Sequence, residues 1–222
     1  MKKKLNVVID LETLSMQPDA AILSVAAVPF NIEAEVTDSD SLHPNAGLPS
    51  YHEVVNVASC ALSGMHFDMD TVQWWSRQSD EAKASILERK PLINISNAIS
   101  GLHQFLCSLA DEHNAELVIW CQGTDFDIPK LKYAFDKFLA DEPKPWKYYN
   151  QRDARTFLLT NLTWFYGEQE NLYDMIPTMP DDVPYAKHSA WCDAMFTAWA
   201  VTYVYGLCRS TFAATTSSTT PK

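Results

Sequence analysis

The feature that most constrains this chain is a short apolar run that ends in two carboxylates. Residues 5–9 (Leu-Asn-Val-Val-Ile) are rich in β-branched side chains and about one strand long, so they predict a buried strand. Asp10 and Glu12 follow at i and i+2, on the same face of that strand. Neighbouring buried carboxylates repel each other and lose hydration, a cost that a cation between them removes. The pair suggests a site for a divalent ion such as Mg²⁺ or Mn²⁺, although acidic residues also end strands where they bind nothing.

Composition predicts one larger globular domain. The chain has 222 residues, of which 47% are hydrophobic and 12% aromatic, enough for a sizeable core. The formal net charge of −11 argues against a broad basic surface, but a carboxylate-rich site with a few local lysines could still accept one strand end. The densest basic stretch is best interpreted as a solvated helix face: Lys130, Lys132, Lys137, Lys144 and Lys147.

The cysteines and the termini exclude several classes. Five scattered cysteines lack zinc-ligand spacing, so we expect reduced thiols, several of them in the core. No apolar run reaches the length of a membrane span, and the lysine-rich start is followed by acids instead of a signal-peptide core. We therefore expect a cytoplasmic protein with no membrane partner.

The hydrophobic pattern predicts alternating strands and helices. Further strands are expected at residues 21–30, 51–57 and 117–120. Helices are expected at about 70–75, 79–88, 95–109, 128–139, 152–162 and 188–205. Residues 171–186 read as a mobile loop, and residues 209–222 as a Thr/Ser-rich disordered tail after a domain at 1–208. This order predicts an α/β or α+β sheet covered by helices.

A second acidic position lies where a strand passes into a helix. Asp127 follows the strand at 117–120, and ligands in open α/β sheets gather at such strand ends. The alternative is that Asp127 is an ordinary N-cap of the next helix, with Pro129 in its first turn. Asp125, two residues earlier, is a rival candidate.

His188 and Asp193 open the last predicted helix. An Asp in the first turns can face inward, while a His on the preceding loop reaches over the same site. The alternative is a histidine satisfied near a helix terminus, followed by an Asp that the helix dipole favours. The choice between these interpretations depends on the rest of the chain.

In order, these motifs resemble those of the DEDDh class of 3′–5′ exonucleases. Ile9-Asp10-Leu11-Glu12-Thr13 is similar to the first motif, Phe126-Asp127 to the second, and His188 with Asp193 to the third. The resemblance is closer to the phage exonuclease A and mycobacterial exoribonuclease-like branch. Its further motifs are Trp74-Trp75 with Gln78-Ser79, Gly123 through Pro129, and Asp153-Ala154-Arg155-Thr156. It covers residues 5–205. Asp125 and Cys192 depart from the usual pattern, and Ser189 stands where the tyrosine variant of the class has its tyrosine.

The resemblance implies a single α/β domain with a ribonuclease H-like mixed sheet flanked by helices. It implies a metal-dependent 3′–5′ exonuclease of bacterial or phage-infected host cytoplasm, which releases nucleoside 5′-monophosphates from 3′ ends of single-stranded DNA or RNA. Two Mg²⁺ or Mn²⁺ ions would be held by Asp10, Glu12, Asp127 and Asp193, with Asp10 bridging them. His188 would act as general base. Thr13, Leu14 and Phe126 would contact the terminal nucleotide.

Other functions remain as alternatives. A catalytically inactive nucleic-acid-binding or interaction module would be expected to lack one of the five residues, and all five are present. An endonuclease on a related sheet would not need the histidine. A purely structural domain would require every motif to be coincidental. The choice between DNA and RNA stays open, as does whether Trp74-Trp75 lies in the core or at a homodimer interface.

Overall fold

The computed structural model describes residues 3–34, 45, 47–87, 92–179 and 187–217. Its five-stranded sheet has the order β3-β2-β1-β4-β5. The strands are β1 (Lys3–Thr13), β2 (Ile22–Phe30), β3 (Tyr51–Val54), β4 (Ala115–Cys121) and β5 (Trp146–Asp153). β1 and β3 pair antiparallel with β2, whereas β4 runs parallel to β1 and β5 parallel to β4. The strand that carries Asp10 therefore lies at the centre of the sheet.

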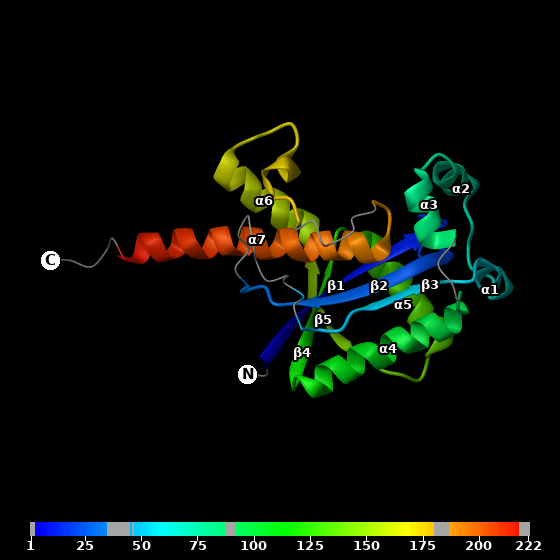
Figure 1. Cartoon of the computed structure of the whole chain (residues 1–222). Helices are drawn as coiled ribbons and strands as arrows, with labels where there is room; N and C mark the ends of the chain where they lie inside the picture. Colours follow the sequence, from blue (N-terminus) through cyan, green and yellow to red (C-terminus); the bar gives the residue numbers. More distant parts are fainter. Residues whose placement is uncertain (1–2, 35–44, 46, 88–91, 180–186, 218–222) are drawn as a thin grey trace.

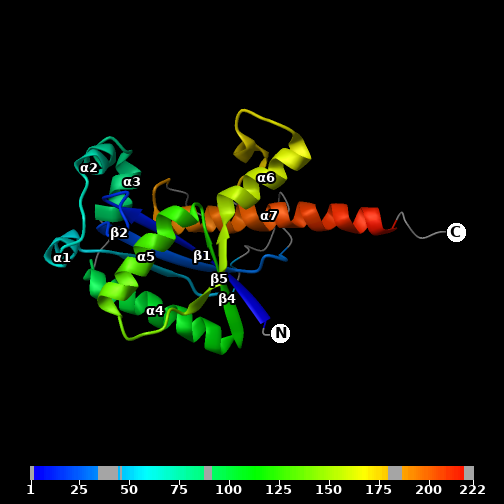
Figure 2. The same cartoon turned by 180° about the vertical axis from the view of Figure 1, so that it is seen from behind.

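Helices cover both faces of this sheet (Figure 1). They are α1 (Val57–Leu62), α2 (Met69–Ser76), α3 (Asp80–Leu87), α4 (Ile95–Glu112), α5 (Thr124–Phe138), α6 (Ala154–Tyr166) and α7 (Ala190–Ser217), with a 3₁₀ turn η1 (Leu172–Met175). One core cluster joins the sheet to α4 and α5, and a second joins it to α6 and α7. Figure 2, the view from behind, shows the same layers, with α7 running past the sheet to the C-terminal end of the chain.

The alternation along β1 sets the direction of the two carboxylates. Val7, Ile9 and Leu11 lie in the core cluster with α4 and α5. Val8 lies in the opposite cluster, with α6 and α7. Because successive side chains on a strand point to opposite faces, Asp10 and Glu12 continue the row of Val8 and face the layer that contains α7.

The predicted fold class is confirmed: the chain forms a mixed sheet flanked by helices on both faces. The third strand ends earlier than predicted, at Val54, because the backbone turns into α1 at Val57. The strand β5 was not predicted at all. Among the cysteines, Cys60, Cys121 and Cys192 are buried and form no disulfide, as expected.

The predicted disordered tail is wrong for its described part. α7 continues through Ser217, so residues 209–217 are helical, whereas residues 218–222 lie outside the described residues. Once packing has formed a helix, each added residue gains a hydrogen bond without the cost of a new nucleus, so a Thr/Ser-rich extension can continue it. Part of the predicted loop at 171–186 is also regular, since η1 lies within it, and residues 180–186 fall outside the described chain. No described helix has both the length and the apolar character needed to cross a bilayer.

Candidate active site

The first two acids lie where β1 leaves its regular pairing with β2. Asp10 pairs with Ala26 and Glu12 with Ser24, but the register shifts between Glu12 and Thr13. Such bulges bend a strand and redirect its side chains. Glu12 is only 9% exposed, and Asp10 is partly exposed beside it.

The third acid comes from the first turn of α5. Asp127 is 3% exposed, whereas Asp125, two residues earlier, is exposed. The helix predicted at about residues 128–139 starts earlier than expected, because α5 begins at Thr124. Asp153 of β5 explains this early start: its carboxylate accepts hydrogen bonds from Thr124 N (2.8 Å) and Thr124 Oγ1 (3.1 Å). Asp127 is therefore not an N-cap, and it is left with one carboxylate oxygen that has no hydrogen-bond partner among the described residues.

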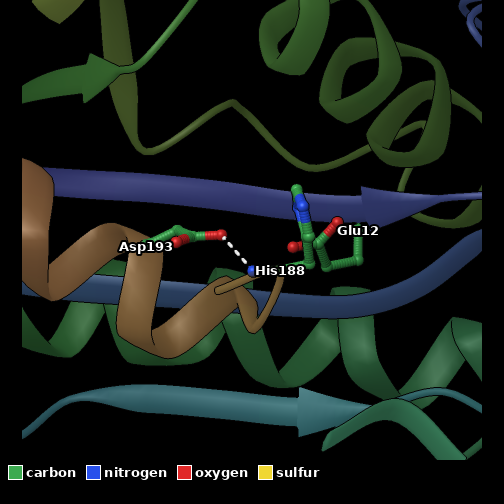
Figure 3. A group of neighbouring side chains, drawn as sticks. All are labelled: Glu12, His188 and Asp193. Atoms are coloured by element: carbon green, nitrogen blue, oxygen red, sulfur yellow. Dashed lines mark hydrogen bonds between the residues drawn. The ribbon is translucent and has the colours of Figure 1, made fainter. Parts of the chain in front are cut away.

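The last two residues come from the start of α7. His188 has a left-handed backbone (φ 64°), which turns the chain into the helix. Its backbone N–H donates to Oδ2 of Asp193 at 3.0 Å (Figure 3). Figure 3 shows the His188 ring beside Glu12, with Asp193 on the adjoining turn of α7. One nitrogen or oxygen atom from each of Glu12, His188 and Asp193 lies within 4.8 Å of the other two.

Asp10 and Glu12 lie close enough to the other acids of the site for their own ionisation to be suppressed. Burial raises the pKa of Asp10 well above its usual value, and repulsion from Asp127, Glu12 and Asp193 raises it further. Burial, followed by repulsion from Asp193 and Asp127, raises the pKa of Glu12 to about 8. Carboxylates that disfavour their own charge in this way are stabilised by a cation among them.

Two cations that the sequence did not assign to the site partly offset the effect of burial on Asp127. Burial raises the pKa of Asp127 to about 7, while the charges of Lys130 and Arg155 act to lower it. The Arg155 guanidinium packs against Gly123. Its atoms lie 3.8–3.9 Å from the position that a Cβ atom would occupy at Gly123. Lys130 is only 1% exposed, so its interpretation as part of a solvated helix face is wrong. The signal that could have revealed it is its i+3 spacing from Asp127, which puts both on one helix face.

The tryptophan pair packs against His188. The Trp74 and His188 ring centroids lie 4.9 Å apart at 80°, and Trp75 is 6.2 Å from the same ring. Trp75 is buried and its Nε1–H donates to the carbonyl of Thr13 at 3.0 Å, whereas Trp74 is 43% exposed. One tryptophan thus belongs to the core and the other covers the histidine. Burial and the nearby charge of Lys187 lower the pKa of His188, which favours its neutral form.

Several groups of the three predicted substrate-binding residues are already engaged in contacts within the chain. The backbone of Leu14 donates to Ala21 and accepts from Asp68. The Thr13 hydroxyl donates to the carbonyl of Ser15 at 2.9 Å. The ring of Phe126 has the Lys130 ammonium 3.3 Å from its centroid. For the predicted contact with the terminal nucleotide, packing against these side chains is therefore better supported than hydrogen bonding to the Leu14 backbone.

The donor set fits divalent metal ions. It combines four carboxylates, a neutral histidine nearby, and one buried Asp127 oxygen without a partner in the described chain. Hard cations such as Mg²⁺ and Mn²⁺ prefer such oxygen ligands. The structure brings together all five residues that the sequence singled out.

The mixed sheet with helices on both faces is a ribonuclease H-like fold, and the acidic site lies at the end of its central strand. The chain belongs to the family described as the Rv2179c-like 3′–5′ exoribonuclease domain, whose model matches residues 5–205. The predicted membership of a 3′–5′ exonuclease family is thereby confirmed.

Comparisons with individual proteins agree. An exodeoxyribonuclease of Enterobacteria phage T4 is 25% identical over an alignment of 166 residues, and the match covers 67% of this chain and 68% of that protein. Apo exonuclease I matches with a TM-score of 0.56 at 13% identity over 92% of this chain and 42% of its own. A zinc-bound complex of E. coli exonuclease I with single-stranded DNA matches with a TM-score of 0.56 at 10% identity, over 94% of this chain and 41% of its own. The chain thus spans about two fifths of the length of exonuclease I, and that likeness concerns the fold.

Proposed function

We propose that the chain removes nucleotides from the 3′ end of single-stranded nucleic acid in a reaction that depends on divalent metal ions. The observation that carries this proposal is the convergence of acids from β1, α5 and α7 around His188. Residues separated by most of the chain meet at one point, on strand and helix ends that the core holds in place. Family membership supports the direction of cleavage.

Asp10, Glu12, Asp127 and Asp193 would hold the metal ions, with Asp10 between the others. When bound, divalent ions provide positive charge at the scissile phosphate and make an attacking water more acidic. Asp10 suits the central position because the other three acids all raise its pKa. The unpartnered oxygen of Asp127 is the second supporting observation.

His188 would accept the proton of the attacking water. Its lowered pKa keeps the ring neutral at pH 7, so it can accept a proton there. The bond between the water oxygen and phosphorus forms as the bond from phosphorus to the 3′ oxygen breaks. The products are a nucleoside 5′-monophosphate and a strand shortened by one nucleotide, whose 3′ oxygen takes a proton from solvent.

Phe126, Thr13 and Leu14 would line the pocket for the terminal nucleotide. Lys130 supports this assignment because it ties the two sides of the pocket together, donating to the carbonyls of Phe126 (3.0 Å) and Met16 (3.3 Å). The sugar preference is not fixed by these residues. The family description names an exoribonuclease and the phage relative an exodeoxyribonuclease, so both polymers belong in the test.

The test uses single-stranded DNA and RNA of one sequence, labelled at the 5′ or the 3′ end, with Mg²⁺, Mn²⁺ or EDTA. A 3′–5′ exonuclease releases the 3′ label as a mononucleotide at once and shortens the 5′-labelled strand in single steps. Asp10→Ala and His188→Ala should each reduce the rate by at least about 10²-fold. Asp125→Ala is the matched control, because Asp125 is an exposed acid two residues from Asp127 and should leave the rate within about twofold.

Different results would overturn different parts of the proposal. If the wild type shortens neither polymer with either metal, the activity itself is wrong and a binding module becomes the better interpretation. If internal fragments appear first, the enzyme is an endonuclease. If Asp10→Ala remains fully active, the site has been placed wrongly.

A further inference from the structure

The edge strand β5 contains a large bulge. Leu117 of β4 pairs with Trp146 and Ile119 pairs with Gln151, so two steps along β4 correspond to five along β5. Three extra residues are therefore accommodated between Trp146 and Gln151. We call residues 147–150 (Lys-Tyr-Tyr-Asn) the tyrosine bulge. Bulges at sheet edges commonly redirect side chains toward a function.

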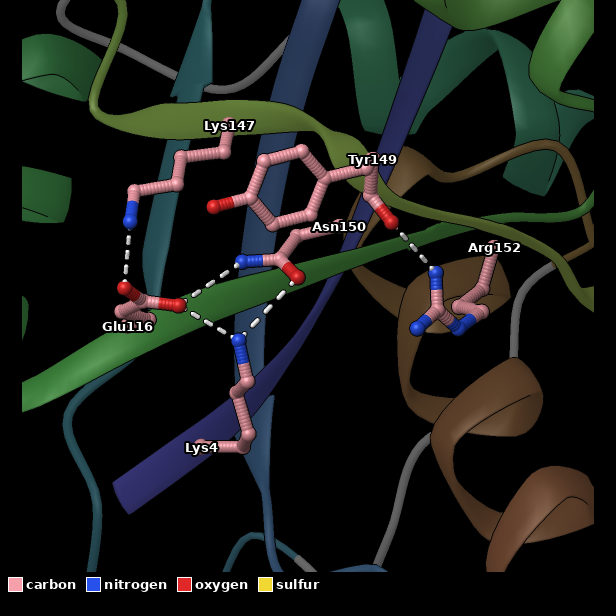
Figure 4. A network of polar contacts seen from close by, with 6 residues as sticks. All are labelled: Lys4, Glu116, Lys147, Tyr149, Asn150 and Arg152. Atoms are coloured by element: carbon pink, nitrogen blue, oxygen red, sulfur yellow. Dashed lines mark hydrogen bonds and ion pairs between the residues drawn. The ribbon is translucent and has the colours of Figure 1, made fainter. Parts of the chain in front are cut away.

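A polar network holds this bulge in one conformation (Figure 4). Glu116 on β4 forms ion pairs with Lys4 on β1 and Lys147 on the bulge. Asn150, only 2% exposed, accepts a hydrogen bond from Lys4 at 3.2 Å. These contacts join three neighbouring strands beneath the bulge, so its shape is fixed by side chains that come from well-ordered elements.

Arg152 fixes the end of the bulge from the other side. Its Nη1 donates to the carbonyls of Tyr149 (2.9 Å) and Gln151 (2.8 Å), as Figure 4 shows for Tyr149. A guanidinium has five N–H donors, so these two bonds use less than half of its capacity. The side chain is exposed and its remaining donors can reach an anionic ligand.

The result of this arrangement is the display of two aromatic rings. Tyr148 is 82% exposed and Tyr149 is 52% exposed. Their ring centroids lie 5.2 Å apart at 82°, and the Lys147 ammonium lies 5.6 Å from the Tyr149 ring. Single exposed aromatic side chains are common, but a rigid adjacent pair flanked by cations is not explained by packing.

The local charge has the opposite sign to that of the whole molecule. The network around the bulge contains three cationic side chains, Lys4, Lys147 and Arg152, against the single carboxylate of Glu116. The chain as a whole carries −11. Aromatic rings beside positive charges are the combination that binds single-stranded nucleic acid without reading its sequence.

We propose that the tyrosine bulge binds the substrate strand on the 5′ side of the scissile bond, by stacking bases on Tyr148 and Tyr149. This inference rests on the proposed function and adds a second contact point for the same strand. The positions are compatible, because Tyr149 lies four residues before Asp153, a separation of at most roughly 13 Å along the chain. Asp153 in turn caps the start of the helix that carries Asp127.

A second copy of this chain is a less suitable occupant. Pairing of two β5 edges would need a regular row of backbone groups, and three extra residues interrupt that row. In such a contact, Lys147 and Arg152 of one copy would also face the same positive charges of the other copy. A nucleic acid strand meets neither obstacle.

The test is a Tyr148→Ala/Tyr149→Ala double variant, assayed on a dinucleotide and on a 20-mer of the polymer that the wild type degrades. A dinucleotide occupies only the active site. We expect KM for the 20-mer to rise about tenfold, with kcat and the dinucleotide kinetics unchanged. Tyr148→Phe/Tyr149→Phe should restore the wild-type KM, because phenylalanine retains the stacking surface. Trp164→Ala, which removes an aromatic side chain that is 81% exposed on α6, is the matched control.

A direct binding measurement separates this inference from the proposed function. Anisotropy of a 5′-labelled 20-mer in EDTA should show about tenfold weaker binding for the alanine double variant, even if the protein cleaves nothing. The inference is overturned if the double variant binds and processes the 20-mer like wild type. It is also overturned if KM rises equally for the dinucleotide and the 20-mer, or if the phenylalanine double variant fails to restore the wild-type KM. A change in the sedimentation of the protein alone would indicate a contact between copies and would overturn it as well.

Discussion

The backbone N–H of His188 donates a hydrogen bond to Oδ2 of Asp193, 3.0 Å away. A carboxylate in the first turn of α7 thus holds the loop residue that precedes the helix. His188 needs this support because its φ of 64° lies in the left-handed region, which costs a non-glycine residue about 1–2 kcal/mol. The five-residue separation between the histidine and the acid therefore has a structural reason as well as the proposed catalytic one.

Replacing His188 with glycine should separate stability from activity. Glycine adopts the left-handed conformation without strain, so His188→Gly should leave the free energy of unfolding unchanged or raise it by up to about 1 kcal/mol. The rate of 3′ nucleotide release should fall by at least about 10²-fold. Thermal denaturation and the labelled-strand assay measure the two effects on one preparation. His188→Asn, which tolerates the same backbone, should be equally inactive, and near-normal activity in either variant would exclude His188 as the base.

The stability of the metal-free protein should fall as pH rises. Folding raises the pKa of Glu12 from 4.5 to about 8 and that of Asp127 from 3.8 to about 7. The folded state therefore binds more protons than the unfolded state within these windows, and its stability decreases with increasing pH from about 4 to about 8. Saturating Mn²⁺ should remove most of this dependence, since bound cations favour the ionised carboxylates. Melting curves at several pH values, with EDTA or with Mn²⁺, test this.

Removing one acidic charge should stabilise the metal-free protein at alkaline pH. Glu12→Gln is nearly isosteric and should raise the melting temperature in EDTA at pH 8.5, by about 2–4 °C for each kcal/mol of relieved repulsion. With Mn²⁺ present the same variant should be less stable than wild type. A melting temperature in EDTA that is insensitive to both pH and Glu12→Gln would contradict the repulsion inferred among these acids.

Removing the Trp74 ring, which covers His188, should change the pH dependence of the rate. Burial lowers the pKa of His188. The partly exposed Trp74 ring contributes to that burial, since its centroid lies 4.9 Å from the centroid of the His188 ring. Trp74→Ala should therefore move the acidic limb of kcat/KM upward, toward the ordinary histidine value near 6.5, and should reduce kcat through loss of ring positioning. Trp164→Ala should leave the profile unchanged. An unshifted acidic limb in Trp74→Ala would show that the ring does not control the ionisation of the base.

Lys130 should matter for substrate binding although its side chain is buried. Lys130→Met preserves length but removes the ammonium that joins Phe126 to Met16, so both carbonyls lose that donor. We expect a loss of about 1–3 kcal/mol in stability and a several-fold rise in KM for the dinucleotide, with a smaller change in kcat. Lys132→Met is the control, because Lys132 is exposed two residues further along the same helix. Equal kinetics in the two variants would contradict a positioning role for Lys130.

The sequence was most informative where patterns are local. The apolar run before Asp10 predicted a buried strand, and the spacing of Ile95, Ile99 and Leu102 predicted α4, because burial leaves a direct signal in the hydrophobic pattern. β5 left no such signal. Its residues Lys147–Arg152 are polar or aromatic, and the bulge breaks the alternation that identifies a strand. A six-residue helix such as α1 is likewise too short to show a period.

The site was predictable as a set of residues, but its internal relations were not. Asp125 and Asp127 are equivalent in the sequence, and only the helix start fixed by Asp153 turns the second one inward. The burial of Lys130 could not be read from a stretch of scattered lysines. Contacts that join distant segments, such as Trp74 on His188, depend on how α2 and α7 meet, and no local pattern reports that.

The location of the site at both ends of the chain has a consequence for biosynthesis. Asp10 and Glu12 emerge from the ribosome early, whereas His188 and Asp193 belong to the last helix. A polypeptide still in translation therefore contains the carboxylate pair but lacks the proposed base and the last proposed metal ligand, so by the proposed mechanism it could not yet cleave nucleic acid. Only after α7 has been released and docked on β1 and β2 does the chain become a nuclease.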